Sequence, residues 1–208
     1  MSQKKSNALL ATTFAIALTG TTAEAETFSP PTREQVQDFL SLARNSTCDT
    51  HTAYPPTIMG MSADGLFSTF DVRFGTARYT DDFQYQTYLD VSILPSTSHL
   101  VQTFVIEHEC AHHSQGHSYE LYDMGFIPTS HFFANEDEAD CTALGQLHHK
   151  YGYSGKETVT ALFTEFEAAN AQIIEELSIP EEQRLILLDK LPERMEEREA
   201  KAHLCPIY

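Results

Sequence analysis

Hydrophobic and polar residues alternate along two stretches in the first half of the chain. From Leu66 to Phe74, and again from about Gln84 to Leu94, aromatic and β-branched residues alternate with polar ones. This period is typical of β-strands that bury one face. We therefore predict a small antiparallel sheet of roughly two to four strands. The preceding segment, from Cys48 to Gly65, contains paired prolines and glycines, which favour a loop.

A spacing of three or four residues between apolar positions predicts helices with one buried face in the rest of the chain. The predicted helices, in chain order, are Thr32–Asn45, about Ser98–His117, about Asn135–Tyr151, and two more that begin at Ser154–Glu157 and Ser178–Glu181. Capping motifs are predicted to start the first helix and the last two. We expect Leu185, Leu188 and Leu191 on the inner face of the last helix, and a break or kink at Pro192. The aromatic segment from Tyr119 to Phe133 contains a glycine and a proline and is predicted to be a loop.

Met1 to Ala25 have the three regions of a secretory signal peptide. They are two lysines near the start, an apolar run from Ala8 to Leu18, and the small-x-small cleavage site Ala23-Glu24-Ala25. A retained membrane anchor is the alternative, but the apolar run is too short to span a bilayer. We therefore expect a periplasmic or secreted protein, with no membrane insertion after removal of the signal. Residues 26–208 contain no repeat or low-complexity linker and are predicted to form a single α+β domain.

The chain is strongly acidic, with 13 Lys and Arg against 30 Asp and Glu and a formal net charge of −17. Removal of the signal takes away Lys4, Lys5 and Glu24, so that 11 basic and 29 acidic residues remain and the charge becomes −18. An acidic surface repels phosphate backbones and anionic lipids, which argues against nucleic acid and membrane surfaces as partners. Acidic residues are concentrated in the predicted C-terminal helices, where they favour a solvated face.

The four cysteines fit an exported protein, because disulfides form readily only in an oxidising compartment. We expect at least two of Cys48, Cys110, Cys141 and Cys205 to form a disulfide, and three complete pairings are possible. A bond between Cys110 and Cys141 is geometrically conceivable, since both helices that carry them must approach one site. Buried free thiols are the alternative. Cys110 points about 200° away from His108 on the predicted helix and is not expected to bind a metal there.

His108, Glu109 and His112 form the pattern H-E-x-x-H inside the second predicted helix. Residues four apart on a helix point in nearly the same direction, so both imidazoles can reach one metal ion. Glu109 points about 100° to the side, where it can hold a metal-bound water instead of the ion. The chain has ten histidines, and an accidental match has a probability on the order of a few per cent. A third ligand is therefore needed to decide.

Glu136 and Asp140 also lie four residues apart, on the third predicted helix. Glu136 can provide the third ligand, and Asp140, one turn further on, can accept the outer N–H of a ligand histidine and fix its tautomer. A catalytic zinc usually has three protein ligands and one position for water. We therefore predict one zinc per chain, held by both histidines and Glu136. His131 and His117 are the next candidates if Glu136 is not the third ligand.

H-E-x-x-H followed after 23 residues by E-x-x-x-D resembles the gluzincin group of zinc metallopeptidases. The full residue pattern is similar to the H-E-x-x-H-H and E-x-x-A-D-C motifs of small bacterial neutral zinc metallopeptidases. In this chain it is His-Glu-Cys-Ala-His-His and then Glu-Asp-Glu-Ala-Asp-Cys. The resemblance covers about Phe104 to Leu147. It implies a zincin-like fold, with a small antiparallel sheet packed on an active-site helix and a helical C-terminal part. The metzincin pattern is rejected, because Gln115 and Ser118 stand where its glycine and third histidine would fall.

The resemblance also implies hydrolysis of peptide bonds in a peptide or protein substrate. Zinc would activate a water, and Glu109 would take its proton as general base and return it to the leaving amine. An edge strand above the active-site helix would pair with extended substrate; Tyr88–Leu94 is the candidate, and an ordinary core strand is the alternative. Tyr119, Tyr122 and His131 are candidates for an electrophile, or else pack the surrounding segment.

Two other functions stay open. An exported zinc-binding protein could keep this site and act as a binding or assembly factor without hydrolysis. The intact Glu109 argues weakly against that function, because metal retention alone requires no base. A helical domain with accidental histidines is the third interpretation, and the E-x-x-x-D spacing lowers the chance of such a coincidence.

Overall fold

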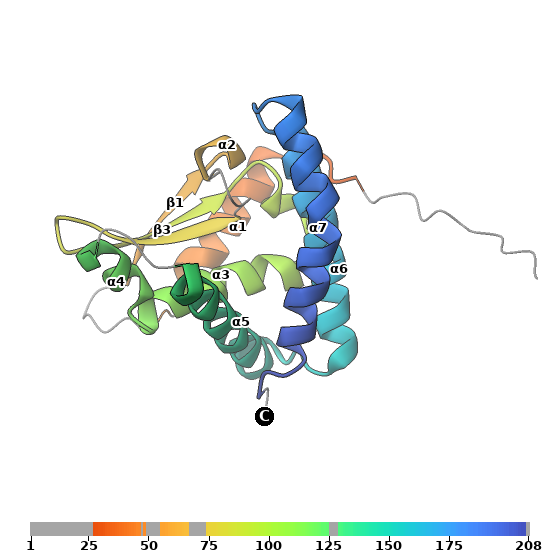
Figure 1. Cartoon of the computed structure of the whole chain (residues 1–208). Helices are drawn as coiled ribbons and strands as arrows, with labels where there is room; N and C mark the ends of the chain where they lie inside the picture. The colour runs from red at the N-terminus through yellow and green to blue at the C-terminus, as the bar shows by residue number, and fades with distance from the viewer. Residues whose placement is uncertain (1–26, 47, 49–54, 67–73, 125–128, 207–208) are drawn as a thin grey trace, which may run out of the picture.

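The computed structural model describes residues 27–46, 48, 55–66, 74–124 and 129–206. Within these ranges the chain forms a mixed α+β fold that is mostly helical, with one small sheet. The elements are α1 Arg33–Asn45, β1 Thr57–Met61, α2 Ala63–Leu66, β2 Gly75–Tyr79, β3 Tyr85–Asp90, the 3-10 helix η1 Leu94–Ser96, α3 His99–Ser114, α4 His117–Met124, α5 Thr129–Tyr151, α6 Lys156–Glu176 and α7 Glu181–Ala202. The sheet lies on one side of α3 and α5 on the other, while α6 and α7 form an antiparallel pair at the far end (Figure 1). The predicted signal peptide lies outside the described residues.

The sheet is mixed, so the prediction of an antiparallel sheet is wrong for one of its pairs. Its three strands have the order β1-β3-β2, with β1 parallel and β2 antiparallel to β3. Strand β1 lies in the segment that the glycines and prolines predicted as a loop, because Pro55 and Pro56 precede the strand and do not interrupt it. Most of the first predicted strand, Leu66 to Phe74, lies outside the described ranges. Of its two described residues, Leu66 ends α2 and Phe74 directly precedes β2, which begins at Gly75.

The predicted edge strand Tyr88–Leu94 is wrong as well. Strand β3 ends at Asp90, because the Asp90 carboxylate accepts hydrogen bonds from the backbone N–H groups of Ile93 (2.8 Å) and Leu94 (3.1 Å) and turns the chain. β3 also pairs on both sides and is therefore the central strand. The strand at the edge nearest to α3 is β2, which packs against α3 and α4.

Helix α3 lies at the centre of the fold and is buried along most of its length. Ser98 caps its N-terminus by accepting a hydrogen bond from the backbone N–H of Val101. Apolar side chains of α3 join those of β3, α5 and α6 in one core. The loop predicted from Tyr119 to Phe133 is wrong on both sides of the undescribed residues 125–128, since α4 continues to Met124 and α5 starts at Thr129. Glycine and proline in that segment misled the prediction, because α4 ends before them.

Two of the three predicted helix caps differ in the structure. Thr32 forms the expected capping box with Gln35, but the residues before α6 and α7 make no capping hydrogen bond through a side chain. Ser178 instead uses its backbone N–H and its hydroxyl to bind the carboxylate of Asp64, at 3.0 and 3.2 Å. Its side chain is therefore committed to α2 and is not available to cap α7.

Of the break or kink predicted at Pro192, the break does not occur, because helix α7 continues through this residue. Leu191 is buried in the interface with the rest of the fold, but Leu185 is 59% exposed and does not belong to the inner face. The first turns of α7 extend beyond the body of the molecule (Figure 1), which explains why an apolar residue there has nothing to pack on. No helix among the described residues is long and apolar enough to cross a membrane.

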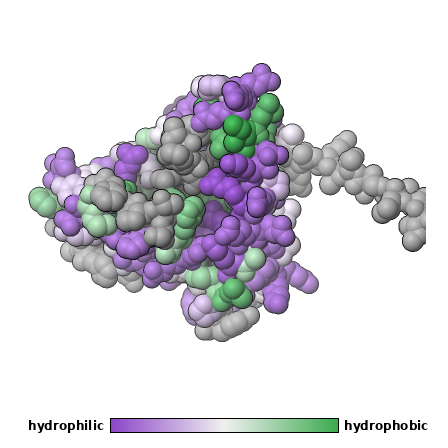
Figure 2. Space-filling view, in the orientation of Figure 1, coloured by the Kyte–Doolittle hydropathy of each residue, from purple (hydrophilic) through white to green (hydrophobic). Residues whose placement is uncertain are grey.

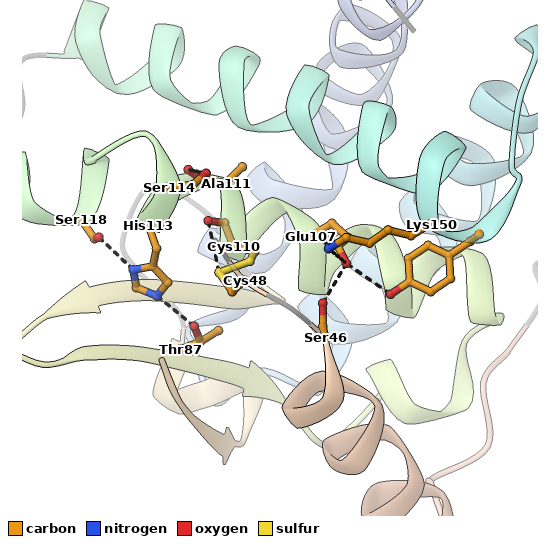
Figure 3. Close-up of a disulfide and its surroundings, with 11 residues drawn as sticks. Ser46, Cys48, Thr87, Glu107, Cys110, Ala111, His113, Ser114, Ser118 and Lys150 are labelled. Carbon is orange, nitrogen blue, oxygen red and sulfur yellow. Dashed lines mark hydrogen bonds and ion pairs between the residues drawn. A yellow bond between two sulfur atoms is a disulfide. The ribbon is translucent and has the colours of Figure 1, made fainter. Parts of the chain in front are cut away.

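Both cysteine pairs are oxidised, which confirms the expectation of at least one disulfide. The bonds join Cys48 to Cys110 and Cys141 to Cys205, so the conceivable pairing of Cys110 with Cys141 is wrong. Cys110 lies on the side of α3 that faces the end of α1, as Figure 3 shows. Cys141 is on α5 and reaches the segment that follows α7. Cys110 and Cys141, although on neighbouring helices, therefore bond to different partners.

Candidate metal centre

The two motif helices bring three potential metal ligands together. His108 and His112 come from α3 and Glu136 from α5, and one ligand atom of each lies within 4.8 Å of the others. The Nε2 atoms of the histidines are 3.1 Å apart, and the Glu136 oxygens lie 3.3 Å from Nε2 of His108 and 3.4 Å from Nε2 of His112. Ligand atoms at about 2.0–2.1 Å from a tetrahedral ion are about 3.3 Å apart. The separations between these donor atoms are therefore close to those around one such ion, although a different Glu136 oxygen faces each histidine. We call His108, His112 and Glu136 the ligand triangle.

The outer nitrogen of each ligand histidine contacts a further side chain. Nδ1 of His108 lies 2.8 Å from Oδ1 of Asp140, the residue predicted to accept its N–H, but the N–H does not point directly at the oxygen. Nδ1 of His112 lies 3.0 Å from Nδ1 of His117, whose Nε2 is 3.6 Å from Oε2 of Glu138. Both contacts leave Nε2 of the two ligands facing Glu136. His117 therefore lies behind a ligand and does not join the three donor atoms.

Arg198 on α7 contributes a contact that the sequence did not predict. Its guanidinium donates two hydrogen bonds to Asp140, from Nε and Nη2 at 2.6 Å each. The same group lies 5.1 Å from the ring centre of Phe166 and 5.9 Å from those of Phe104 and Phe163. Nothing in the sequence near Arg198 distinguishes it from the other charged residues of α7. Its contact with Asp140 is therefore revealed only by the fold.

The charges of the centre favour a cation between its carboxylates. Burial alone would raise the pKa of Asp140, but Arg198 and His108 outweigh it and hold that pKa at about 2. Burial would likewise lower the pKa of His108, yet the carboxylates of Asp140 and Glu136 raise it to about 10. The pKa of Glu136 falls well below its usual value despite burial, because both histidines contact it. The same attraction for positive charge would stabilise a divalent ion.

Glu109 lies in the wall of a cleft that opens beside the three ligands. The cleft has a volume of about 270 Å³, and His108, His112 and Glu136 line it together with Glu109. Gly75, Thr76 and Ala77 of strand β2 also line the cleft, and phenylalanines form the apolar part of the wall. Glu109 thus faces the cleft from α3 without joining the ligand triangle, which is the position that its helical spacing predicted.

Buried polar contacts on the far side of α3 fix how the helix is rotated. The Glu107 carboxylate accepts hydrogen bonds from the hydroxyl of Ser46 at 2.8 Å and from Nζ of Lys150 at 2.9 Å, as Figure 3 shows. The hydroxyl of Tyr151 adds a third at 3.2 Å. These contacts tie α3 to the end of α1 and to α5. They therefore help to keep the ligand face of α3 turned toward the cleft.

His113 of α3 is buried, and its contacts are structural. Its Nε2 lies 3.0 Å from the hydroxyl of Thr87 on β3, and its Nδ1 lies 2.9 Å from the hydroxyl of Ser118 on α4 (Figure 3). Burial and the nearby His112 lower the pKa of His113 to about 4, so the ring is neutral near pH 7. It connects the sheet to α4 and points away from the ligand triangle.

The candidates for an electrophile do not reach the cleft. Tyr119 and Tyr122 are on α4, and their rings contact that of Tyr79 at 5.3 Å between centres. His131 is exposed, with its Nδ1 at 3.8 Å from Glu120. None of these three side chains lines the cleft. For the two tyrosines, the structure agrees with the alternative of packing.

The chain matches no protein-family model, no curated protein and no solved structure.

Proposed function

We propose that this chain is an exported zinc metallopeptidase of the gluzincin type with a zincin-like fold. The observation that carries the proposal is the cluster of His108, His112 and Glu136 beside Glu109. The two Nε2 atoms are 3.1 Å apart, Oε2 of Glu136 lies 3.3 Å from Nε2 of His108, and Oε1 lies 3.4 Å from Nε2 of His112. Two imidazoles and one carboxylate are a known donor set for catalytic zinc, and they leave one position for a water. A site that served only to retain metal would have no need of Glu109.

Zinc in this place would act as a Lewis acid that polarises the scissile carbonyl and lowers the pKa of a water toward neutrality. Glu109 would accept the proton of the attacking water and return it to the nitrogen of the leaving amine. Asp140 would hold His108 with Nε2 toward the cleft, and Arg198 would keep Asp140 ionised. Each of these roles belongs to a side chain whose position supports it.

Strand β2 is the proposed binding site for the backbone of the substrate. Gly75, Thr76 and Ala77 line the cleft, and among the described residues β2 pairs only with β3. An extended polypeptide could therefore add a strand next to β2, with backbone hydrogen bonds that tolerate many sequences. This assignment replaces the segment Tyr88–Leu94 with the strand that lies at the edge.

Export remains part of the proposal. The signal-like segment Met1–Ala25 motivates it, and the two disulfides favour an oxidising compartment. A mature protein from the native host that keeps these residues at its N-terminus would refute the cleavage.

Substitution of Glu109 tests the chemistry directly. Glu109→Gln keeps the size of the side chain but cannot accept a proton at neutral pH. Peptide hydrolysis should fall by about 10² to 10⁴-fold, while the zinc content and the unfolding midpoint stay the same. Glu175→Gln, which removes an exposed carboxylate of α6, is the matched control and should hydrolyse as the wild type does.

Two results would overturn the proposal. If Glu109→Gln hydrolyses peptides as fast as the wild type, Glu109 is not the base. If the zinc-loaded wild type cleaves nothing in a broad peptide library but captures a partner from the cell envelope, the chain is a zinc-binding protein that acts as a binding or assembly factor.

A further inference from the structure

An exposed group of aromatic side chains lies next to the cleft. Tyr79 at the end of β2 is its centre, and the rings of Tyr119, Tyr122 and Phe83 surround it at 5.3, 5.3 and 6.3 Å between centres. We call these four residues the aromatic platform. Large aromatic side chains usually find a place in the interior, yet Phe83 is 74%, Tyr119 48% and Tyr122 40% exposed. The two tyrosines pack on Tyr79, which also contacts the buried Tyr85 at 5.0 Å between ring centres, but this packing leaves much of their surface and most of Phe83 exposed.

The backbone at Phe83 supports a role outside the core. Phe83 lies in the β2–β3 turn with a φ of 58°, in the left-handed region that bulky residues rarely adopt. The turn is closed by backbone hydrogen bonds between Thr80 and Phe83 (2.9 Å) and between Thr80 and Gln84 (3.0 Å). These contacts present the Phe83 ring to solvent at the tip of the hairpin. Figure 2 shows a hydrophobic spot at this tip surrounded by hydrophilic surface.

One carboxylate lies beside the platform, and two more belong to residues next to it along the chain. Asp81 and Asp82 belong to the same turn, and Asp123 is exposed on α4. Desolvation and the nearby carboxylate of Asp81 both raise the pKa of Tyr122, which places Asp81 at the edge of the platform. Aromatic faces with neighbouring carboxylates attract Lys and Arg side chains, since the ring quadrupole and the negative charges act in the same direction. The chain as a whole has a net charge of −17, which strengthens that attraction.

The platform and the cleft are parts of one continuous surface. Ala77 of β2 lines the cleft, and Tyr79 on the same face of the strand is two residues further along. Helix α4 likewise contributes Leu121 to the cleft and Tyr119 to the platform. Two residues of a strand span about 7 Å. A polypeptide paired with β2 in the cleft would thus reach the platform about two residues beyond the point where it passes Ala77.

We propose that the aromatic platform binds Lys and Arg side chains of an extended polypeptide whose backbone lies along β2, so that this chain selects cationic substrates. The inference rests on the proposed peptidase function in one respect, namely that the bound polypeptide is the substrate. Binding itself requires no hydrolysis, so the two can be tested separately.

A binding experiment isolates the platform from catalysis. The probe is a fluorescein-labelled unstructured peptide that contains several lysines, compared with the same peptide after replacement of each Lys by Gln. The protein is the zinc-loaded Glu109→Gln variant. Each cation bound on an exposed aromatic face should tighten binding by about twofold to fivefold, so anisotropy should show clear preference for the Lys peptide. The preference should shrink in 1 M salt, where charges are screened within about 3 Å.

Matched variants distinguish local recognition from general attraction by an acidic protein. Asp81→Asn with Asp82→Asn should remove most of the preference. Glu181→Gln with Glu182→Gln makes the same change in net charge on exposed residues at the start of α7, which lies away from the β2–β3 hairpin (Figure 1), and should retain the preference. Tyr119→Ala with Tyr122→Ala should also reduce the preference; circular dichroism and thermal unfolding check that these variants fold.

The possible results separate this inference from the proposed function. Equal affinity for the Lys and Gln peptides, or equal effects of the two double carboxylate variants, would refute the platform even if the wild type hydrolyses peptides. Loss of the preference only in the hairpin and tyrosine variants would support it, even if the wild type proves to hydrolyse nothing. If the wild type does hydrolyse peptides, Lys or Arg should be enriched on one side of its cleavage sites.

Discussion

Gly75 and Glu109 are in contact in a way that only glycine permits. A Cβ atom added to Gly75 would lie 2.6 Å from Oε1 of Glu109 and 2.7 Å from its Cγ. Atoms of a real side chain do not approach so closely, so the backbone of β2 touches the Glu109 carboxylate because position 75 has no side chain. The edge strand therefore sets where the proposed general base lies, in addition to lining the cleft.

Gly75→Ala should impair hydrolysis and leave the metal in place. The added methyl group must push Glu109 or the strand aside, while the ligand triangle on α3 and α5 is not touched. Misplacement of a reacting group by about 1 Å can cost about 100-fold in rate, so kcat/KM should fall by about 10- to 100-fold. Steady-state hydrolysis and zinc analysis of the same preparation measure both quantities.

Gly145→Ala is the matched control for that substitution. Gly145 lies within α5, and an added Cβ would meet nothing within 4 Å. Alanine is preferred over glycine inside a helix by about 1 kcal/mol, so this variant should be as active as the wild type and slightly more stable. Wild-type rates in a folded Gly75→Ala protein would show that the contact does not position Glu109.

Arg198→Met should destabilise the protein and weaken zinc binding. It leaves the buried Asp140 carboxylate without its bidentate partner, and breaking a buried ion pair costs about 3–5 kcal/mol. We expect the lower end, since the Arg198 side chain is 23% exposed. Loss of support for His108 should weaken zinc binding by about 10- to 100-fold. Denaturant unfolding of the metal-free protein and competition with a chelator provide the two measurements.

Asp140→Asn in the Arg198→Met background serves as the control. The amide leaves no unpaired charge, so the double variant should lose less stability than the sum of the two single variants. Additive losses would mean that the two side chains act independently, and the assigned contact would then not explain the effect of Arg198.

The sequence predicted which residues of the candidate metal centre share a helix face, because that spacing is local. His108 and His112 lie on one face of α3 for the same reason that Glu136 and Asp140 lie on one face of α5, namely the period of the helix. The sheet was predicted less well, because strand order depends on partners far apart in the chain. Strand β1 pairs with β3 across α2 and β2, and no local pattern marks β3 as central.

Contacts over long sequence distances were also missed. Arg198 reaches Asp140 across 58 positions, and each disulfide joins cysteines more than 60 positions apart. A helical period defines which face a residue takes, but not which element covers that face. The pairing of Cys110 was therefore mispredicted, although its direction away from His108 was predicted.

Glu136→Ala should abolish tight zinc binding, whereas His117→Ala should only weaken it. Glu136 offers a donor atom to the triangle, while His117 contacts the outer nitrogen of His112. His108→Ala and His112→Ala should behave like Glu136→Ala, and Asp140→Ala should weaken binding by about 10- to 100-fold. Zinc per chain after dialysis against a mild chelator measures the effect. Full occupancy in Glu136→Ala would identify another residue as the third ligand, with His131 the exposed candidate on α5.

Removal of either disulfide should cost stability, but only one of them should affect zinc. The bonds close loops with sequence separations of 62 and 64, for which chain entropy gives about 4 kcal/mol each. Cys141 directly follows Asp140, and Cys205 follows the helix that carries Arg198, so this bond helps to hold the two sides of that ion pair together.

Cys141→Ser with Cys205→Ser should therefore weaken zinc binding as well as lower the unfolding midpoint. Cys48→Ser with Cys110→Ser is the matched control, since it removes a disulfide that closes a loop of similar length on the opposite side of α3. This variant should lower the unfolding midpoint, while its zinc affinity stays close to that of the wild type. Thiol counting under denaturing conditions should find no free thiol in the wild type. After reduction, each double variant should have two thiols fewer than the wild type. If both double variants bind zinc equally well, the Cys141–Cys205 disulfide contributes only to stability. The support of His108 would then come from Arg198 and Asp140 without help from this disulfide.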